Sequence, residues 1–320
     1  MWTARQFHDI YIINLETGER RQIKEKSPSY MRFSPKENTQ LDQDQDSSWY
    51  TRSTADGKEY RLTTPQTFAA WDEDNDVPDY PSPYGIAGWT DDDQSILIKD
   101  RYDIWKFDPI AASSPVNLTV NGRKEQITYS LIQLDREKRA YNTSEAQYLT
   151  GLTKEPKVPD INYRLNKPVA PKALLAGNFK LAALAKAKDA NAVIYTQETY
   201  EQYPDIQLSN LSFKNPPFDR RHPPAGFHHL GTAELTSWIS LDGRPLEGVI
   251  YKPADFDPNK KYPVIVNFYE RNANTLYNYH MPSPGRQRST IRSTSATAYH
   301  FNPDVRFTDG YPGESCYNCV

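Results

Sequence analysis

The sequence predicts a mainly β protein built from repeated antiparallel units. Among its 320 residues are 22 Tyr, 6 Trp and 25 Pro, a composition that suits sheets with aromatic faces joined by proline-containing turns. Several short segments alternate apolar and polar residues and end at turns that contain Gly or Asp. A chain of this length can form two domains or one large β architecture.

A recurring Asp-Ile pair indicates how these strands are grouped. The pair opens a predicted strand at Asp9, Asp103 and Asp205, at intervals of about 94 and 102 residues. Each interval is about twice the ~40–50 residues of a propeller blade. The pattern is clearest over residues 88–108. It predicts about four antiparallel blades between residues 9 and 211, which make part of a β-propeller.

Residues 240–269 carry a different pattern. Asp242-Gly243 is a predicted turn between two strands, and residues 263–268 form a largely apolar run that is rich in β-branched residues. Such a run is typical of a strand buried on both faces of a parallel sheet. Tyr269 follows the run directly, so the predicted strand ends in a polar aromatic side chain.

These features resemble the prolyl oligopeptidase family of serine peptidases, in which a β-propeller accompanies an α/β-hydrolase domain. The resemblance rests on residues 241–269, on the unit at 88–108 and on the Phe-Ser-Pro turn at 32–36. It implies a partial β-propeller over residues 1–230, followed by the start of an α/β-hydrolase domain over residues 231–320. It also implies a fragment, truncated at both ends, of an enzyme that hydrolyses peptide bonds in short peptides. A non-catalytic propeller that acts as a binding module is the alternative.

The resemblance leaves one candidate catalytic residue in the chain. The nucleophile elbow of an α/β-hydrolase reads Gly-x-Ser-x-Gly, and the nearest match surrounds Ser315, where Tyr317 replaces the second glycine. Ser315 is therefore not expected to be the nucleophile. The family order of Ser, Asp and His places the whole triad after residue 320, so we expect this chain to be inactive. Tyr269 matches the family tyrosine that donates its hydroxyl to the oxyanion, although Glu270 replaces the small residue that usually follows. The alternative is an ordinary tyrosine packed at a strand end.

Two features near the C-terminus are expected to be structural. The Asp-Val-Arg sequence at residues 304–306 resembles a loop that lies beside the active site in the family, but Phe307 stands in place of its glycine. Cys316 and Cys319 form a Cys-x-x-Cys sequence without the preceding strand and following helix of a thioredoxin-type redox pair. A local structural role is predicted for both features.

No metal or other cofactor is expected. Residues 72–76 are acidic and resemble the start of a calcium loop, but Val77 stands where such a loop needs glycine. His222, His228 and His229 lie near one another in the sequence, yet they lack the spacing and the additional ligands of a zinc site. The acidic segment is therefore predicted to be a solvated loop between blades.

The net charge and the N-terminal residues limit the expected binding partners and the expected cellular compartment of the protein. The net charge is −3 and the isoelectric point is about 6.1, so we expect neither nucleic acid nor membrane as a partner. A peptide substrate is expected, and homo-oligomerisation stays open. The first twelve residues lack the pattern of a signal peptide. We therefore expect a cytoplasmic protein, or a periplasmic or secreted one if a signal precedes Met1.

Two local predictions remain open from sequence. Residues 172–188 have helix propensity, but the Gly-Asn pair within them favours strand, turn and strand. The blade pattern also fades over residues 37–45, 139–161, 216–229 and 286–300. Short frameshifts in the coding sequence and natural loop insertions explain these four patches equally well.

Overall fold

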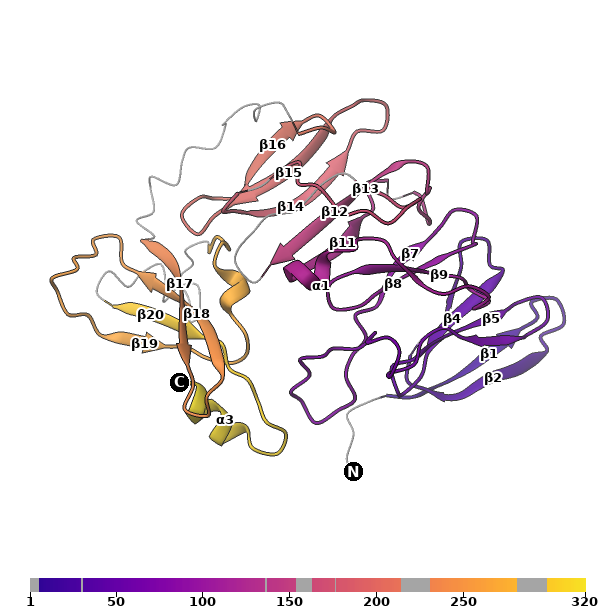
Figure 1. Cartoon of the computed structure of the whole chain (residues 1–320), viewed down its shortest axis with the longest axis horizontal. Coiled ribbons are helices and arrows are strands. Elements are labelled where there is room, and N and C mark those ends of the chain that lie inside the picture. The colour runs from indigo at the N-terminus through magenta and orange to yellow at the C-terminus, as the bar shows by residue number, and fades with distance from the viewer. Residues whose placement is uncertain are drawn as a thin grey trace. The chain divides into compact units, whose positions relative to one another are not determined.

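The computed structural model describes residues 6–29, 31–135, 137–153, 163–175, 177–213, 231–280 and 298–320. The chain divides into two compact units, one made of Met1–Gly151 and Asp160–Ala173 and the other of Leu152–Pro159 and Leu174–Val320. Most of its secondary structure is antiparallel sheet in which neighbouring strands are also neighbours in the sequence (Figure 1). The predicted mainly β fold of repeated antiparallel units is confirmed.

Four sheets occupy the described part of the first unit. Their strands are β1 (His8–Ile13) and β2 (Arg20–Ser27); β3 (Arg32–Phe33), β4 (Thr39–Gln43), β5 (Trp49–Ser53) and β6 (Glu59–Arg61); β7 (Ile86–Trp89), β8 (Ile96–Lys99), β9 (Ile104–Phe107) and β10 (Val116–Asn117); and β11 (Ile127–Ile132), β12 (Ala146–Thr153) and β13 (Tyr163–Arg164). A short helix, α1 (Gly122–Glu125), precedes β11. The two complete four-stranded sheets have the strand number and the sequential order of propeller blades.

Strand β8 is buried on both of its faces. Ile96 and Ile98 belong to the hydrophobic core shared with Leu41 and Trp49 of the sheet β3–β6, whereas Leu97 belongs to the core shared with β11 and β12. All three β8 side chains have no exposed surface. Burying each of them contributes about 1.5–3 kcal/mol, so this strand stabilises both hydrophobic cores of the first unit.

The aspartate of the Asp-Ile pair has a structural explanation at Asp103. Its carboxylate accepts hydrogen bonds from the Thr119 hydroxyl at 2.5 Å, from the Gly122 amide at 2.9 Å and from the Arg123 amide at 3.1 Å. These bonds join the start of β9 to the turn that follows β10. A Cβ atom at residue 122 would lie 2.6 Å from the Asp103 carboxylate oxygen, which explains the glycine there.

The described second unit contains two sheets. One has the strands β14 (Lys180–Lys186), β15 (Val193–Glu198) and β16 (Asp205–Ser209); the other has β17 (Thr232–Ile239), β18 (Pro245–Lys252), β20 (Tyr299–Pro303) and β19 (Val264–Val266), in that spatial order. The second sheet is mixed, because β18 is antiparallel to β17 and β20 whereas β19 and β20 are parallel. A 3₁₀ turn, η1 (Ala273–Thr275), follows β19, and a helix, α3 (Pro312–Cys319), follows β20.

The run at residues 263–268 differs from its prediction. It forms only the three-residue strand β19, which lies at the edge of its sheet. Val264, Ile265 and Val266 are 56%, 42% and 40% exposed, so the expectation of a strand buried on both faces is wrong in the described structure. A parallel strand is buried on both faces when it has neighbouring strands on both sides and helices over both faces of the sheet. Strand β19 has a neighbouring strand, β20, on one side only of its described sheet.

Other local predictions have different outcomes: the preference for strand over helix in residues 172–188 holds over residues 180–186, whereas the blade pattern continues in two of the four patches where the sequence pattern fades. Residues 180–186 form strand β14, and no helix is present in the described part of 172–188, because the strand pairs along β15. The patch at 37–45 contains β4, whose polar side chains at residues 40, 42 and 43 are buried, so the blade pattern continues there. The patch at 139–161 likewise contains β12. The patch at 216–229 lies outside the described residues, as does most of the patch at 286–300.

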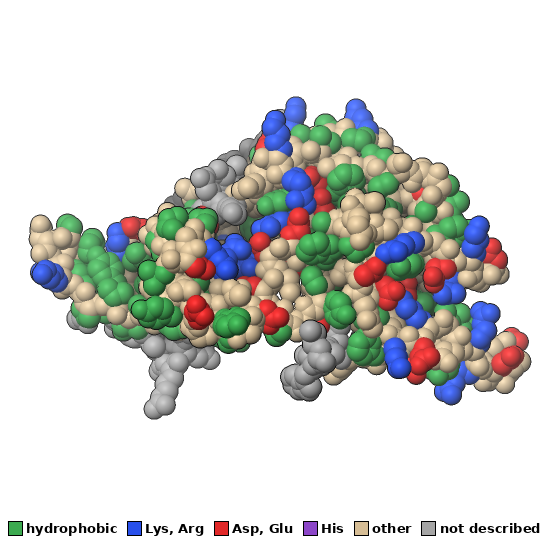
Figure 2. Space-filling model, turned by 60° about the horizontal axis from the view of Figure 1, so that its bottom comes forward, with side chains coloured by type: hydrophobic (Ala, Val, Ile, Leu, Met, Phe, Trp, Pro, Cys, Tyr) green, Lys and Arg blue, Asp and Glu red, His purple; other side chains and the backbone are tan. Residues whose placement is uncertain are grey.

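Acidic and basic side chains are interspersed on the face shown in Figure 2, as the small net charge suggests. Several of them form ion pairs, such as that between Arg52 and Glu59 at 2.6 Å. Within the described segments, every helix is too short or too polar to cross a bilayer.

Candidate functional site

The candidate site lies at one edge of the mixed sheet of the second unit. Because β19 and β20 are parallel, their carboxyl-terminal ends meet at the same edge. Strand β18 runs in the opposite direction and therefore begins at this edge, where the Asp304 amide donates to the Glu247 carbonyl at 2.8 Å. The segments that follow β19 and β20 thus come together beside the start of β18.

The segment after β19 is fixed at three points to the end of β20 and to the segment that follows it. The Asn267 amide donates to the Phe301 carbonyl at 2.9 Å, and the Val305 amide donates to the Glu270 carbonyl at 3.2 Å. The Asp304 carboxylate accepts hydrogen bonds from the amide of Asn272 and, at 2.9 Å, from the amide of Ala273. The bend between Asn267 and Ala273 is therefore held on both sides.

Tyr269 lies within this held bend. It stands three residues beyond the end of β19, and 62% of its surface is exposed. Its backbone is bracketed by the hydrogen bonds of Asn267 and Glu270, whereas its side chain is largely in contact with solvent. Tyr269 therefore combines a backbone held by hydrogen bonds with an exposed side chain.

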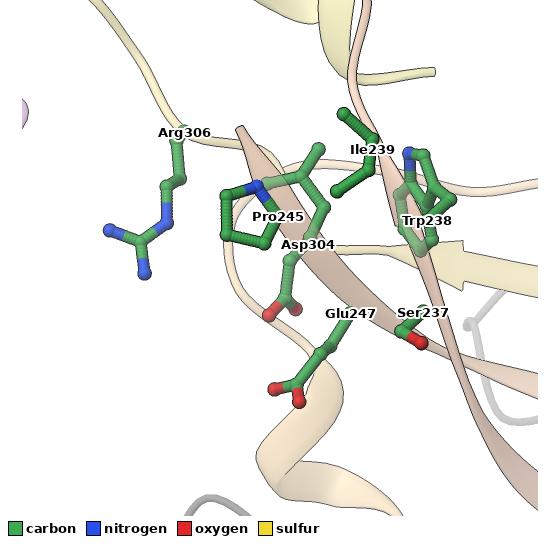
Figure 3. Close-up of a pocket in the computed structure, with 8 residues that line it drawn as sticks. Ser237, Trp238, Ile239, Pro245, Glu247, Asp304 and Arg306 are labelled. Carbon is green, nitrogen blue, oxygen red and sulfur yellow. The ribbon is translucent and has the colours of Figure 1, made fainter. Parts of the chain in front are cut away.

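A cavity of about 350 Å³ opens at the same sheet edge. It is lined by Ser237, Trp238, Ile239, Pro245, Leu246, Glu247, Asp304 and Arg306. The side chains of Glu247 and Asp304 extend in the same direction, and Arg306 lies on the other side of Asp304 (Figure 3). The cavity therefore combines an aromatic wall with groups of both charges.

The Asp-Val-Arg segment at 304–306 takes the structural role predicted for it, through the Asp304 bonds and the burial of Val305 against Leu246 and Cys319. Helix α3 is fixed to the same sheet by the Trp238 ring nitrogen, which donates to the Cys319 carbonyl at 2.9 Å. Cys316 and Cys319 are both free thiols on this helix.

Ser315 lies inside α3 and not on a turn between a strand and a helix. Its hydroxyl donates to the Tyr311 carbonyl at 2.7 Å and accepts from the Thr308 amide at 2.9 Å. The side chain is buried, with 6% of the residue exposed. This geometry gives Ser315 a structural role, since its hydroxyl joins α3 to the segment at Thr308 that precedes the helix.

The acidic segment at 72–76 is held by arginines. Asp74 pairs with Arg101 at 2.5 Å, and Glu73 pairs with Arg123 at 3.1 Å. The Glu73 amide also donates to the Tyr84 hydroxyl at 2.9 Å, and burial raises the pKa of Tyr84 to about 12. Over the residues that the structure describes, no group of three or more acidic, histidine or cysteine side chains is placed to hold a metal ion. His222, His228 and His229 lie outside those residues.

Sequence reasoning named Tyr269 and residues 304–306 but missed Glu247. The alternation of residues 245–252 could have indicated the orientation of Glu247, because it places Glu247 on the same face of its strand as Val249. Its position opposite Asp304 depends on the strand order, which the sequence does not reveal.

No protein-family model and no curated protein sequence matches the chain. Solved structures do match it. A protein assigned as a dipeptidyl aminopeptidase IV of Bacteroides ovatus has a TM-score of 0.60 at 15% identity, over 93% of this chain and 44% of that protein. A prolyl endopeptidase has a TM-score of 0.56 at 13% identity, over 97% of this chain and 43% of its own. Puromycin hydrolase has a TM-score of 0.50 at 13% identity, over 91% and 43%.

These three structures are of the prolyl oligopeptidase family. The chain shares their fold over nearly all of its length, so the resemblance seen in the sequence is confirmed at the level of the fold. The chain spans less than half the length of each of the three.

Proposed function

We propose that this chain is part of a serine peptidase that hydrolyses peptide bonds in short peptides. In this proposal residues 1–230 belong to a β-propeller that restricts access to the active site, and residues 231–320 open the hydrolase domain. The observation that carries the proposal is the parallel pair β19 and β20, since Tyr269 follows the carboxyl-terminal end of β19 and Asp304 and Arg306 follow that of β20. Catalytic groups of α/β sheets collect at that edge. The shared fold with three peptidases supports it.

Tyr269 is the proposed oxyanion donor. In acyl transfer a serine attacks the scissile carbonyl, and the carbonyl oxygen becomes an oxyanion in the tetrahedral intermediate. The Tyr269 hydroxyl would donate a hydrogen bond to that oxygen, beside a backbone amide next to the serine. A donor of this kind contributes roughly 10²–10³ in rate. Its exposed position on a backbone held by hydrogen bonds supports the role.

The nucleophile of the proposed enzyme is a residue outside these 320. No Gly-x-Ser-x-Gly sequence occurs in the chain, and the Ser315 hydroxyl is engaged inside α3. The chain by itself is thus proposed to be inactive. The same observation favours the second candidate, a β-propeller that binds peptides without cleaving them.

Sequencing the gene beyond both ends of this region separates the two candidates. The peptidase proposal expects an open frame that continues past Val320 to a Gly-x-Ser-x-Gly sequence, and a full-length product that cleaves fluorogenic peptide amides and reacts with a fluorophosphonate. A frame that ends at Val320, with a product that binds peptides but does not cleave them, would support the binding module and overturn the peptidase proposal.

A further inference from the structure

The turn between β15 and β16 carries a buried tyrosine at its tip. Thr199 and Gln202 close the turn, since the amide of each donates to the carbonyl of the other, at 3.2 and 3.3 Å. Between them Tyr200 is only 4% exposed, whereas the neighbouring residues 201–203 are exposed. Turns usually lie at the surface, so a buried side chain at the tip indicates that another element covers it.

The covering element is the mixed sheet of the same unit. Tyr200 shares a hydrophobic core with Val249 and Tyr251 of β18 and with Leu276, and its ring centroid lies 4.9 Å from that of Tyr251. The ring of His280 meets both tyrosine rings edge-on, at 6.4 and 6.3 Å. Among the described residues of this core, Tyr200 is the one that comes from the hairpin β15–β16. Tyr200 therefore joins the two sheets of the second unit.

Leu276 ends the segment that carries Tyr269. It follows η1 directly, and its amide donates to the Ala273 carbonyl at 3.4 Å. The amide and the hydroxyl of Thr275 donate to the Asn272 carbonyl at 2.9 and 2.7 Å. A series of hydrogen bonds therefore connects the bend that carries Tyr269 to the buried side chain of Leu276.

We propose that Tyr200 is a positioning residue for Tyr269. By completing the core that buries Leu276, Tyr200 keeps the segment around η1 against β18, and the hydroxyl of Tyr269 is thereby held in one place. Such support matters, because a shift of about 1 Å in a catalytic group can lower the rate about 100-fold. The inference rests on the oxyanion role proposed for Tyr269, and it adds the hairpin β15–β16 to the elements on which the site depends.

Hydrogen exchange of the 320-residue chain, followed by mass spectrometry, tests the packing step without any activity. The amides of residues 272, 273, 275, 276 and 278 are all hydrogen-bonded, so their exchange reports the opening of this segment. Tyr200→Leu should speed that exchange at least about tenfold, because leucine lacks the ring that packs against Tyr251. Tyr200→Phe keeps the ring and should stay close to the wild type.

Tyr195→Leu is the matched control for the exchange experiment. Tyr195 is 5% exposed and lies in β15 of the same hairpin, but its ring packs against Phe213 and it is not part of the core that contains Leu276. Its substitution should leave the exchange of residues 272–278 unchanged, and peptides from β8 in the first unit report any global unfolding. Equal acceleration by Tyr195→Leu and Tyr200→Leu, or none by Tyr200→Leu, would overturn the positioning role.

In a full-length protein that cleaves peptides, a double-mutant cycle tests the step from Tyr200 to Tyr269. Tyr200→Leu should lower kcat about tenfold with little change in KM. In the Tyr269→Phe background the same substitution should change kcat less than about twofold, since the hydroxyl that Tyr200 positions is already absent. Equal effects in both backgrounds would contradict an action through Tyr269. A full-length protein that cleaves no peptide would contradict the proposed function itself, and this inference with it, whatever the exchange rates.

Discussion

The carboxylate of Asp304 lies 2.9 Å from the amide nitrogen of Ala273 and also accepts a hydrogen bond from the preceding amide. This contact joins the segment after β20 to the segment after β19, 31 residues earlier in the chain. The bend that carries Tyr269 is therefore held in part by a side chain from the segment after β20.

Removing that carboxylate should destabilise the second unit. Asp304→Ala leaves two backbone amides without an acceptor, which should lower the free energy of unfolding by about 1–3 kcal/mol. Urea unfolding followed by tyrosine and tryptophan fluorescence measures the change. Asp304→Asn keeps one acceptor oxygen and should lose less than half as much; equal losses for the two variants would mean that the carboxylate acts by its charge alone.

Asp103 should be far more important to stability than the equivalent Asp9. Asp103→Ala removes the acceptor of three hydrogen bonds at a residue that is 1% exposed, so the loss should be at least about 3 kcal/mol. Asp9, in the exposed strand β1, accepts one bond, from the Lys26 amide of β2 at 2.9 Å. Asp9→Ala should cost under about 1 kcal/mol. Similar losses in chemical unfolding would contradict the structural role assigned to Asp103.

Alkaline pH should reveal the burial of Tyr84, whose pKa rises from 10.0 to about 12. Below pH 10 its phenol is protonated in the folded and in the unfolded chain, so its full contribution to stability is present. Between pH 10 and about pH 12 the unfolded chain loses the proton first, and the free energy of unfolding falls. Tyr84→Phe should make that fall shallower, while Tyr317→Phe, at a residue that is 75% exposed, serves as the control. A slope that Tyr84→Phe leaves unchanged would rule out this explanation.

The 320-residue chain should not react with a fluorophosphonate probe. Its closest match to a nucleophile elbow is Ser315, which is buried and hydrogen-bonded within α3, and a serine needs an adjacent base to react. Gel fluorescence after labelling, with an active serine hydrolase as positive control, measures this. Labelling that disappears in Ser315→Ala would show that the active site lies elsewhere than proposed.

In a full-length protein that cleaves peptides, Tyr269→Phe should lower kcat by roughly 10–10³ with little change in KM. The substitution keeps the ring and removes only the hydroxyl, so a bond made mainly in the transition state is lost. Steady-state kinetics on a fluorogenic peptide amide separates the two constants. Tyr317→Phe, on the exposed surface of α3, should leave both constants unchanged. A change confined to KM would mean that Tyr269 contacts the bound substrate without stabilising the oxyanion.

The parts of the fold that depend on local pattern were predictable from sequence. The alternation and turns of residues 88–108 are sufficient to predict β7, β8 and β9, because each strand pairs with its sequence neighbour. Strand β4 was missed because its buried side chains at residues 40, 42 and 43 are polar, so a hydrophobic pattern does not reveal its burial.

The arrangement of the candidate site was less accessible from sequence. Tyr269 and residues 304–306 were recognised by their resemblance to a family, but the contact that joins them requires β20 to lie between β18 and β19. That order brings together residues about thirty positions apart. The exposure of β19 also depends on which elements cover it, and its own apolar sequence does not specify them.

Because β8 is buried on both of its faces, proteolytic cleavage at one place should affect the whole of the first unit. Leu97 belongs to one core, and its neighbours Ile96 and Ile98 belong to the other. A fragment that ended after β10 would therefore expose Leu97 and Ile104 on one side while still burying Ile96 and Ile98 on the other. Sheets whose side chains enter the cores on both of their sides in this way stabilise their nearest neighbours. Limited proteolysis between β10 and β11 should consequently destabilise the preceding sheets as well, so that the first unit is degraded as a whole and does not lose its sheets one by one.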